Sequence, residues 1–207
     1  TYGKFIAEPF EQGYGTTVGN ALRRVLISSI EGAAVANIRI NGVLHEFSAI
    51  DGVMEDVAQI VLNVKKLVLR YHGKDPKMIV IDVKKQGEVT GRVIQADETV
   101  EIINPDHHIA TLTKDVKFRM EMDVVRGRGY VTAERNKKEG APIGSIAIDS
   151  IFSPVSKVNF LVEETRVGQV TDYDRLILEI WTNGAMSSEE ALLYASNILQ
   201  RHLDIFV

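Results

Sequence analysis

A short glycine-rich segment is the first place in this sequence where residue types and spacing could do chemistry. Gly13, Gly15 and Gly19 lie between a predicted strand and a predicted helix. Backbone N–H groups at such a helix start bind phosphate in nucleotide-binding proteins. Here the spacing differs from the dinucleotide-binding pattern, and the next predicted strand ends at Asn41 without an acidic residue to hold a ribose. We therefore favour a structural turn, with a nucleotide-binding enzyme as the alternative function.

Histidines and carboxylates are the other candidates for chemistry, since both serve as metal ligands and proton carriers. The candidates are His45, Glu46, His107 and His108. No H-x-x-x-H spacing or carboxylate pair accompanies them, and neighbours in a strand point to opposite faces. No serine stands in a nucleophile-elbow setting. We predict packing or solvated histidines, with no catalytic residue, no metal site and no cofactor.

Basic residues gather in a glycine-rich segment at residues 126–144 and in the adjacent pair Arg23 and Arg24. With Tyr130 for stacking, the segment could touch nucleic acid. Glu134 and Glu139 interrupt its charge, which favours a solvated loop or a protein contact. The arginine pair lies off the apolar stripe of its helix and could pair with a partner's carboxylates.

Helical periodicity predicts the elements at the two ends of the chain. Apolar residues repeat at helical spacing over residues 16–30, after a strand at residues 4–8. Ser187 and Glu190 form a capping box that opens the last helix. The apolar arc of that helix is wide, which fits equally a helix that also packs on a partner and a deeply buried helix in a monomer.

The stretch between the two ends is predicted to be mostly β. Strict alternation at residues 116–124 is typical of an antiparallel strand with one buried face, whereas both faces of the strand at residues 175–181 look covered. One exception is a helix over residues 53–64, predicted from the spacing of its valines and isoleucine. Further strands are expected at residues 35–40, 67–71, 78–83, 92–96, 100–103, 109–112, 145–151 and 157–163.

Composition limits the class of protein. The 207 residues are 45% hydrophobic and 25% charged, so the chain can bury a sizeable core. Its net charge of −4 gives no electrostatic reason for a nucleic-acid partner, and the absence of cysteine is typical of a reducing cytosol. No apolar run reaches the roughly 20 residues of a membrane span. The missing initiator methionine leads us to expect a fragment of a longer chain.

Several long motifs resemble one family along the whole chain. They are EPFEQGYGTTVGNALRRVL at residues 8–26, GVLHEF at 42–47, RGRGYV at 126–131, PIG at 142–144 and TNG at 182–184. Together they resemble the N-terminal domain of the bacterial RNA polymerase alpha subunit. The resemblance implies an α+β fold: residues 1–31 and 154–207 would form a dimerisation subdomain of two helices on an antiparallel sheet, and residues 32–153 an inserted, mostly β subdomain.

The resemblance also implies a function. The family's N-terminal domain forms a homodimer in the bacterial cytoplasm and nucleates assembly of the polymerase by binding the beta and beta-prime subunits, with no active site of its own. Direct DNA binding is not expected, because the family's DNA-binding domain is absent from this chain. Dimer contacts would come from Val18, Leu22, Val25, Leu26, Leu192, Leu199, Leu203 and Phe206. Contacts to beta would come from Arg24, His45 and Lys65, and contacts to beta-prime from Lys157, Glu163 and Arg166. The motif glycines would be turn and close-packing residues.

Overall fold

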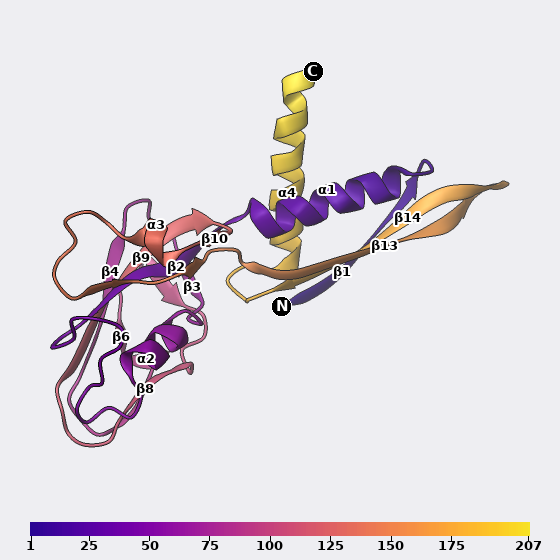
Figure 1. The fold of residues 1–207 in the computed structure, drawn as a ribbon. Coiled ribbons are helices and arrows are strands. Elements are labelled where there is room, and N and C mark those ends of the chain that lie inside the picture. The colour runs from indigo at the N-terminus through magenta and orange to yellow at the C-terminus, as the bar shows by residue number, and fades with distance from the viewer. The chain divides into compact units, whose positions relative to one another are not determined.

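The computed structural model describes residues 1–207 and divides them into two compact units (Figure 1). The first unit joins Thr1–Glu31 to Ser153–Val207, and the second comprises Gly32–Phe152. Both combine helices with antiparallel strands, and strands dominate. The α+β class predicted from the sequence is confirmed. None of the helices is both long and apolar enough to cross a membrane.

A three-stranded antiparallel sheet forms the base of the first unit, in the order β1–β14–β13. Its strands are β1 (Tyr2–Phe10), β13 (Val155–Val167) and β14 (Val170–Thr182). Two helices pack on it, α1 (Tyr14–Ser28) and α4 (Ser188–Leu203), and a 3-10 turn (Asp204–Phe206) follows α4. In Figure 1, α1 runs along the sheet and α4 crosses α1.

The helices cover one face of this sheet. On β14, Leu176, Leu178 and Ile180 are buried, whereas the alternate residues are only partly buried. The prediction that both faces of this strand are covered is therefore wrong, because α1 and α4 share the same side. Their common core consists of Leu22, Leu26, Ile30, Val155, Val158, Leu178, Ile180, Ala191 and Ala195.

The predicted capping box opens α4. The Ser187 hydroxyl accepts a hydrogen bond from the Glu190 N–H at 3.1 Å, and the Glu190 carboxylate accepts one from the Ser187 N–H at 2.9 Å. Each side chain thus satisfies a backbone donor that the first turn of a helix leaves free. This prediction is confirmed.

The second unit is built on a seven-stranded sheet in the order β6–β4–β9–β2–β3–β7, with β11 paired to β2. Two smaller sheets pair β10 with β12 and β5 with β8. The strands are β2 (Glu31–Ile40), β3 (Leu69–Tyr71), β4 (Lys77–Val83), β5 (Gly87–Thr90), β6 (Ile94–Gln95), β7 (Val100–Ile102), β8 (His108–Leu112), β9 (Phe118–Arg128), β10 (Tyr130–Val131), β11 (Ser145–Ala147) and β12 (Ser150–Ile151). The helical elements are α2 (Val57–Val64), α3 (Ala133–Asn136) and a 3-10 turn (Gly91–Val93).

Alternation along β9 builds the core of this unit. Phe118, Met120 and Met122 are almost completely buried, while Arg119 and Glu121 between them are partly exposed and form an ion pair at 3.3 Å. The predicted strand with one buried and one wet face is confirmed.

Several predicted elements differ from the structure, among them the strand expected at residues 145–151, which is divided into β11 and β12. The helix expected from residue 53 begins at Val57, because Asp56 caps it and Val53 instead forms a β-bridge with Leu112. The strand expected at residues 92–96 is shortened to β6, because its first two residues belong to a 3-10 turn. The segment predicted as a loop at residues 126–144 contains the end of β9, strand β10 and helix α3.

Candidate subunit-interaction sites

The N-terminal end of α1 is occupied by a carboxylate of the chain itself. Asp174 on β14 accepts hydrogen bonds from the N–H groups of Gly13 and Gly15, at 2.9 and 3.0 Å, and is itself buried. The N–H of Tyr14 between them donates to the Glu11 carbonyl. Because these donors are used within the chain, the place where a phosphate would bind at the helix start is already filled.

Close packing explains the other glycines of the motif. A Cβ added to Gly19 would lie 2.7 Å from Phe160 Cδ2 and 2.8 Å from Leu176 Cδ1. A Cβ on Gly15 would lie 2.9 Å from the Cβ of Asp174. Gly13 has a positive φ of 88°, which a turn into the helix requires. The prediction that these are turn and close-packing residues is confirmed.

The eight residues predicted for a dimer interface fall into three groups by burial. Leu22 and Leu26 lie in the core of their own unit, and four others are partly buried against it: Val18, Val25, Leu192 and Leu199. Leu203 and Phe206 are 56% and 86% exposed. Free apolar area among these residues is therefore concentrated at the end of α4.

More apolar residues are exposed on these two helices than the periodicity indicated. Leu193 and Tyr194 are exposed on α4, Ile27 is exposed on α1, and Ile205 follows α4 with 77% of its surface free. The C-terminal end of α4 projects beyond α1 in Figure 1, and residues 200–207 are all exposed. We call Leu203, Ile205 and Phe206 the α4 apolar end.

Arg24 lies on the exposed side of α1. Arg23, Arg24, Ile27, Ser28 and Val158 line an open depression of about 520 Å³. Arg23 already has partners, because it donates to Asn20 at 3.1 Å and lies over the Phe160 ring at 5.4 Å from its centre.

His45 lines a larger hollow in the second unit. The cavity measures about 720 Å³, and the residues around its mouth include Leu44, Phe47 and Ile143, all strongly exposed. The His45 ring lies 3.2 Å from the Ser48 hydroxyl. An open, apolar-rimmed hollow of this size suits a protruding side chain of a partner.

Lys65 is engaged within its own unit. Its ammonium group donates to Asp149 at 3.0 Å, and Asp149 also accepts from the Ala133 N–H at 2.8 Å. Lys65 first, and then Ala133, hold the pKa of the Asp149 carboxyl below its usual range. Ala133 also lines the His45 hollow, so the ion pair and the hollow are neighbours. A partner would have to compete with Asp149 for the Lys65 charge.

The three residues predicted to contact beta-prime lie on β13. Lys157 places its ammonium 4.7 Å from the centre of the Trp181 ring. Glu163 lies 3.9 Å from Arg175, and Arg166 donates to the Gly168 carbonyl at 2.5 Å. The register of β13 with β14 is continuous from Lys157 to Glu163, so these two side chains share one face of the sheet.

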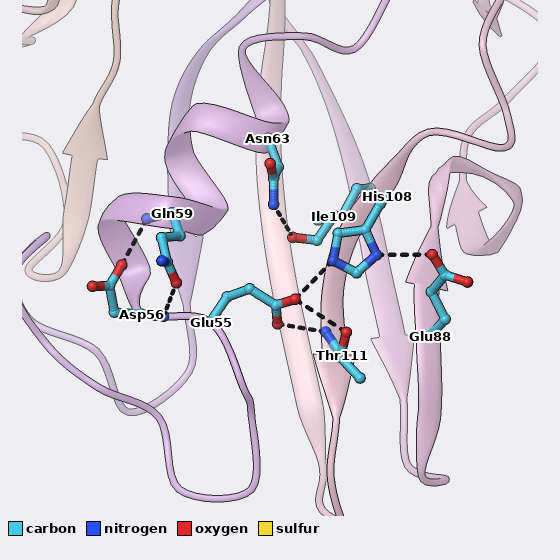
Figure 2. A network of polar contacts seen from close by, with 8 residues as sticks. All are labelled: Glu55, Asp56, Gln59, Asn63, Glu88, His108, Ile109 and Thr111. Atoms are coloured by element: carbon cyan, nitrogen blue, oxygen red, sulfur yellow. Dashed lines mark hydrogen bonds and ion pairs between the residues drawn. The ribbon is translucent and has the colours of Figure 1, made fainter.

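A polar network around His108 was missed by sequence reasoning. Its ring nitrogens face Glu55 at 2.7 Å and Glu88 at 2.9 Å (Figure 2). The ring of His107 instead bonds the Asn63 carbonyl at 2.8 Å. The two glutamates lie 53 and 20 residues from His108 in sequence, so no local spacing could reveal them. No group of three or more His, Asp or Glu side chains is arranged to hold a metal ion.

Comparison with known proteins identifies the family. The family model described as "RNA polymerase Rpb3/RpoA insert domain" matches residues 38–153, more than half of the chain. The chain belongs to the RNA polymerase alpha-subunit family. The matched residues begin within β2 and run through the second unit to the start of the first unit's later segment.

Individual relatives match the whole chain, including the residues of this chain that lie outside the family model. The chain is 56% identical over its full length to a protein of Clostridium botulinum (strain Eklund 17B / Type B) named DNA-directed RNA polymerase subunit alpha. Identically named proteins of Alkaliphilus oremlandii and Geobacter metallireducens are each 55% identical over the same 207 residues. The chain spans 66%, 65% and 61% of these three relatives.

Proposed function

We propose that this chain is a non-catalytic assembly scaffold of a bacterial RNA polymerase in the cytoplasm. In this proposal two copies form a homodimer, and the dimer then recruits the beta and beta-prime subunits for DNA-templated transcription. Full-length identity of 54–56% to proteins named as alpha subunits supports the assignment.

The main observation in support of the proposed homodimer is the exposed α4 apolar end. Soluble proteins rarely leave large apolar side chains in a contiguous exposed patch unless a partner covers them. Here Leu203, Ile205 and Phe206 are all more than half exposed. A two-fold axis brings the same patch of both copies together, so one exposed helix end can serve both sides of the interface.

The buried members of the predicted interface have a supporting role in this proposal. Leu22 and Leu26 anchor α1 to the sheet and to α4, and this packing fixes the direction in which α4 presents its free end. The first unit would therefore be the dimerisation subdomain, with the second unit inserted between its two segments.

The same proposal holds that this chain has no catalytic site of its own. Asp174 fills the helix start that a nucleotide enzyme would use, which weighs against the alternative function. No cofactor is needed for a role that consists of binding other subunits.

For the large subunits, we propose Arg24 and His45 as the principal beta contacts. Arg24 is exposed, and its guanidinium fork can pair with a carboxylate through two hydrogen bonds. Lys65 would contribute by orienting the neighbouring segment through Asp149. Lys157, Glu163 and Arg166 remain the proposed beta-prime contacts on β13.

Reconstitution tests the scaffold. Purified chain carrying an affinity tag should capture purified beta subunit, and the Arg24→Ala variant should capture less while keeping the molecular mass of the wild type. Arg23→Ala is the matched control, because Arg23 already lies over Phe160. Undiminished capture by Arg24→Ala would remove Arg24 from the interface, and no capture by the wild type would contradict the scaffold itself.

A further inference from the structure

His108 is held between two carboxylates that come from different elements. Its Nε2 atom lies 2.7 Å from Glu55, in the segment that precedes α2, and its Nδ1 atom lies 2.9 Å from Glu88 on β5 (Figure 2). His108 itself begins β8, which pairs with β5. The imidazole therefore links three segments of the second unit.

Both contacts can be hydrogen bonds only when the ring carries two protons. A neutral imidazole has one N–H group, so its other nitrogen presents a lone pair. Facing a carboxylate, that lone pair gives repulsion in place of a bond. The arrangement of one ring between two carboxylates thus fits the imidazolium form and disfavours the neutral form.

The two carboxylates are held unequally. Glu55 also accepts from the backbone N–H of Thr111 at 2.6 Å and from the Thr111 hydroxyl at 3.0 Å, and its side chain is 13% exposed. Glu88 is 61% exposed, and its hydrogen bond is to His108. When His108 loses a proton, the contact to Glu55 has the stronger support and the contact to Glu88 is the one to break.

We propose that Glu55, His108 and Glu88 form a proton-dependent clasp within the second unit. With His108 charged, the clasp fastens β5 and the segment before α2 to the start of β8. With His108 neutral, the arm to Glu88 opens, while Glu55 stays bound to Thr111. The clasp thereby couples the order of β5 to pH.

Other charged groups near the clasp have partners of their own. Asp56, next to Glu55, caps α2 by accepting from the Gln59 N–H at 2.7 Å. The helix that packs on β8, α2, contains no charged residue. Asp106 is paired with Arg92 at 2.5 Å. From the elements that pack against the ring, Glu55 and Glu88 are the charges that face it.

The direction of the pH dependence follows from these contacts. The hydrogen bond to Glu55, and then that to Glu88, raise the pKa of His108 above its ordinary value. Burial alone would raise the pKa of Glu55, but hydrogen bonds from His108 and Thr111 outweigh it and lower that pKa. The Glu88 arm of the clasp is therefore lost as pH rises through the folded pKa of His108.

A titration of the histidine ring signals by NMR tests the clasp in the intact chain. His108 should titrate above its ordinary pKa of about 6.5. Glu88→Gln should move the His108 titration to lower pH, whereas Glu98→Gln, the same change at an exposed position, should leave it in place. A His108 titration at or below the ordinary pKa of the imidazole group, or an unmoved titration in Glu88→Gln, would overturn the proposal.

Hydrogen exchange measures the opening itself. After correction for the intrinsic pH dependence of exchange, protection of the β5 amides should fall as the wild-type His108 loses its proton. In His108→Arg the charge is permanent, so protection should stay constant over the same pH range. Constant wild-type protection would overturn the proposal whether or not the variant folds.

Discussion

Removal of the Asp174 carboxylate should selectively weaken the first unit. In Asp174→Ala the N–H of Gly15 loses its acceptor in a buried position, while Gly13 lies at the surface where water can replace the carboxylate. An unsatisfied buried donor costs about 1–3 kcal/mol. Loss of a negative charge at a helix N-terminus adds about 0.3–1 kcal/mol. We therefore expect the free energy of unfolding to fall by about 1–4 kcal/mol for Asp174→Ala, the sum of these two contributions.

Urea unfolding followed by tryptophan fluorescence measures the loss of stability in the first unit, which contains Asp174. Trp181 is the single tryptophan and lies on β14, the strand that carries Asp174. With an m-value of about 2 kcal/mol/M, the urea midpoint should fall by about 0.5–2 M. Asp174→Asn keeps an acceptor oxygen, so its midpoint should lie between those of the wild type and the alanine variant.

Asp172→Ala is the matched control, because it removes the same charge from an exposed position two residues away on β14. All variants are compared at one protein concentration, since dimerisation would contribute to stability. Equal midpoints for Asp174→Ala and Asp172→Ala would refute the reasoning that the carboxylate holds the start of α1.

Two further predictions concern packing and charge. Gly19→Ala should lower the free energy of unfolding by about 1–3 kcal/mol in the same fluorescence assay, because its Cβ would overlap Phe160; Asn20→Ala should not, and an equally stable Gly19→Ala would contradict the close packing. Lys65→Met should raise the pKa of Asp149, so that the stabilisation by this carboxylate is lost at a higher pH as pH falls. The carboxyl carbon signal of Asp149 in an NMR titration measures this shift, and an unchanged pKa would contradict the role of the ion pair.

Periodic elements were predictable from the sequence, because their burial repeats with a simple period. Burial along β9 alternates in step with the apolar and polar residues of its sequence, and the capping box of α4 lies at its predicted positions. Short elements such as α3 and β10 were not predictable: four and two residues give no period to detect, and the charged composition of the segment favoured a loop.

Tertiary contacts between distant segments were also beyond sequence reasoning. The role of Gly13 and Gly15 as donors depends on Asp174, about 160 residues away, and the clasp depends on Glu55 and Glu88 meeting His108. The sequence did indicate which glycines and histidines to consider. It could not indicate which carboxylates bond to those glycines and histidines, since only folding brings the distant residues together.

The solution mass of the chain over a dilution series tests the central claim most directly. Light scattering should give twice the chain mass of 23.0 kDa, and the double variant Leu203→Asp and Phe206→Asp should shift the mass to that of the single chain. Phe47→Asp is the matched control, because Phe47 is 84% exposed on the other unit and its replacement should leave the dimer intact. A wild type that remains at 23.0 kDa at every concentration, or a dimer that survives both charges, would contradict dimerisation through the α4 apolar end.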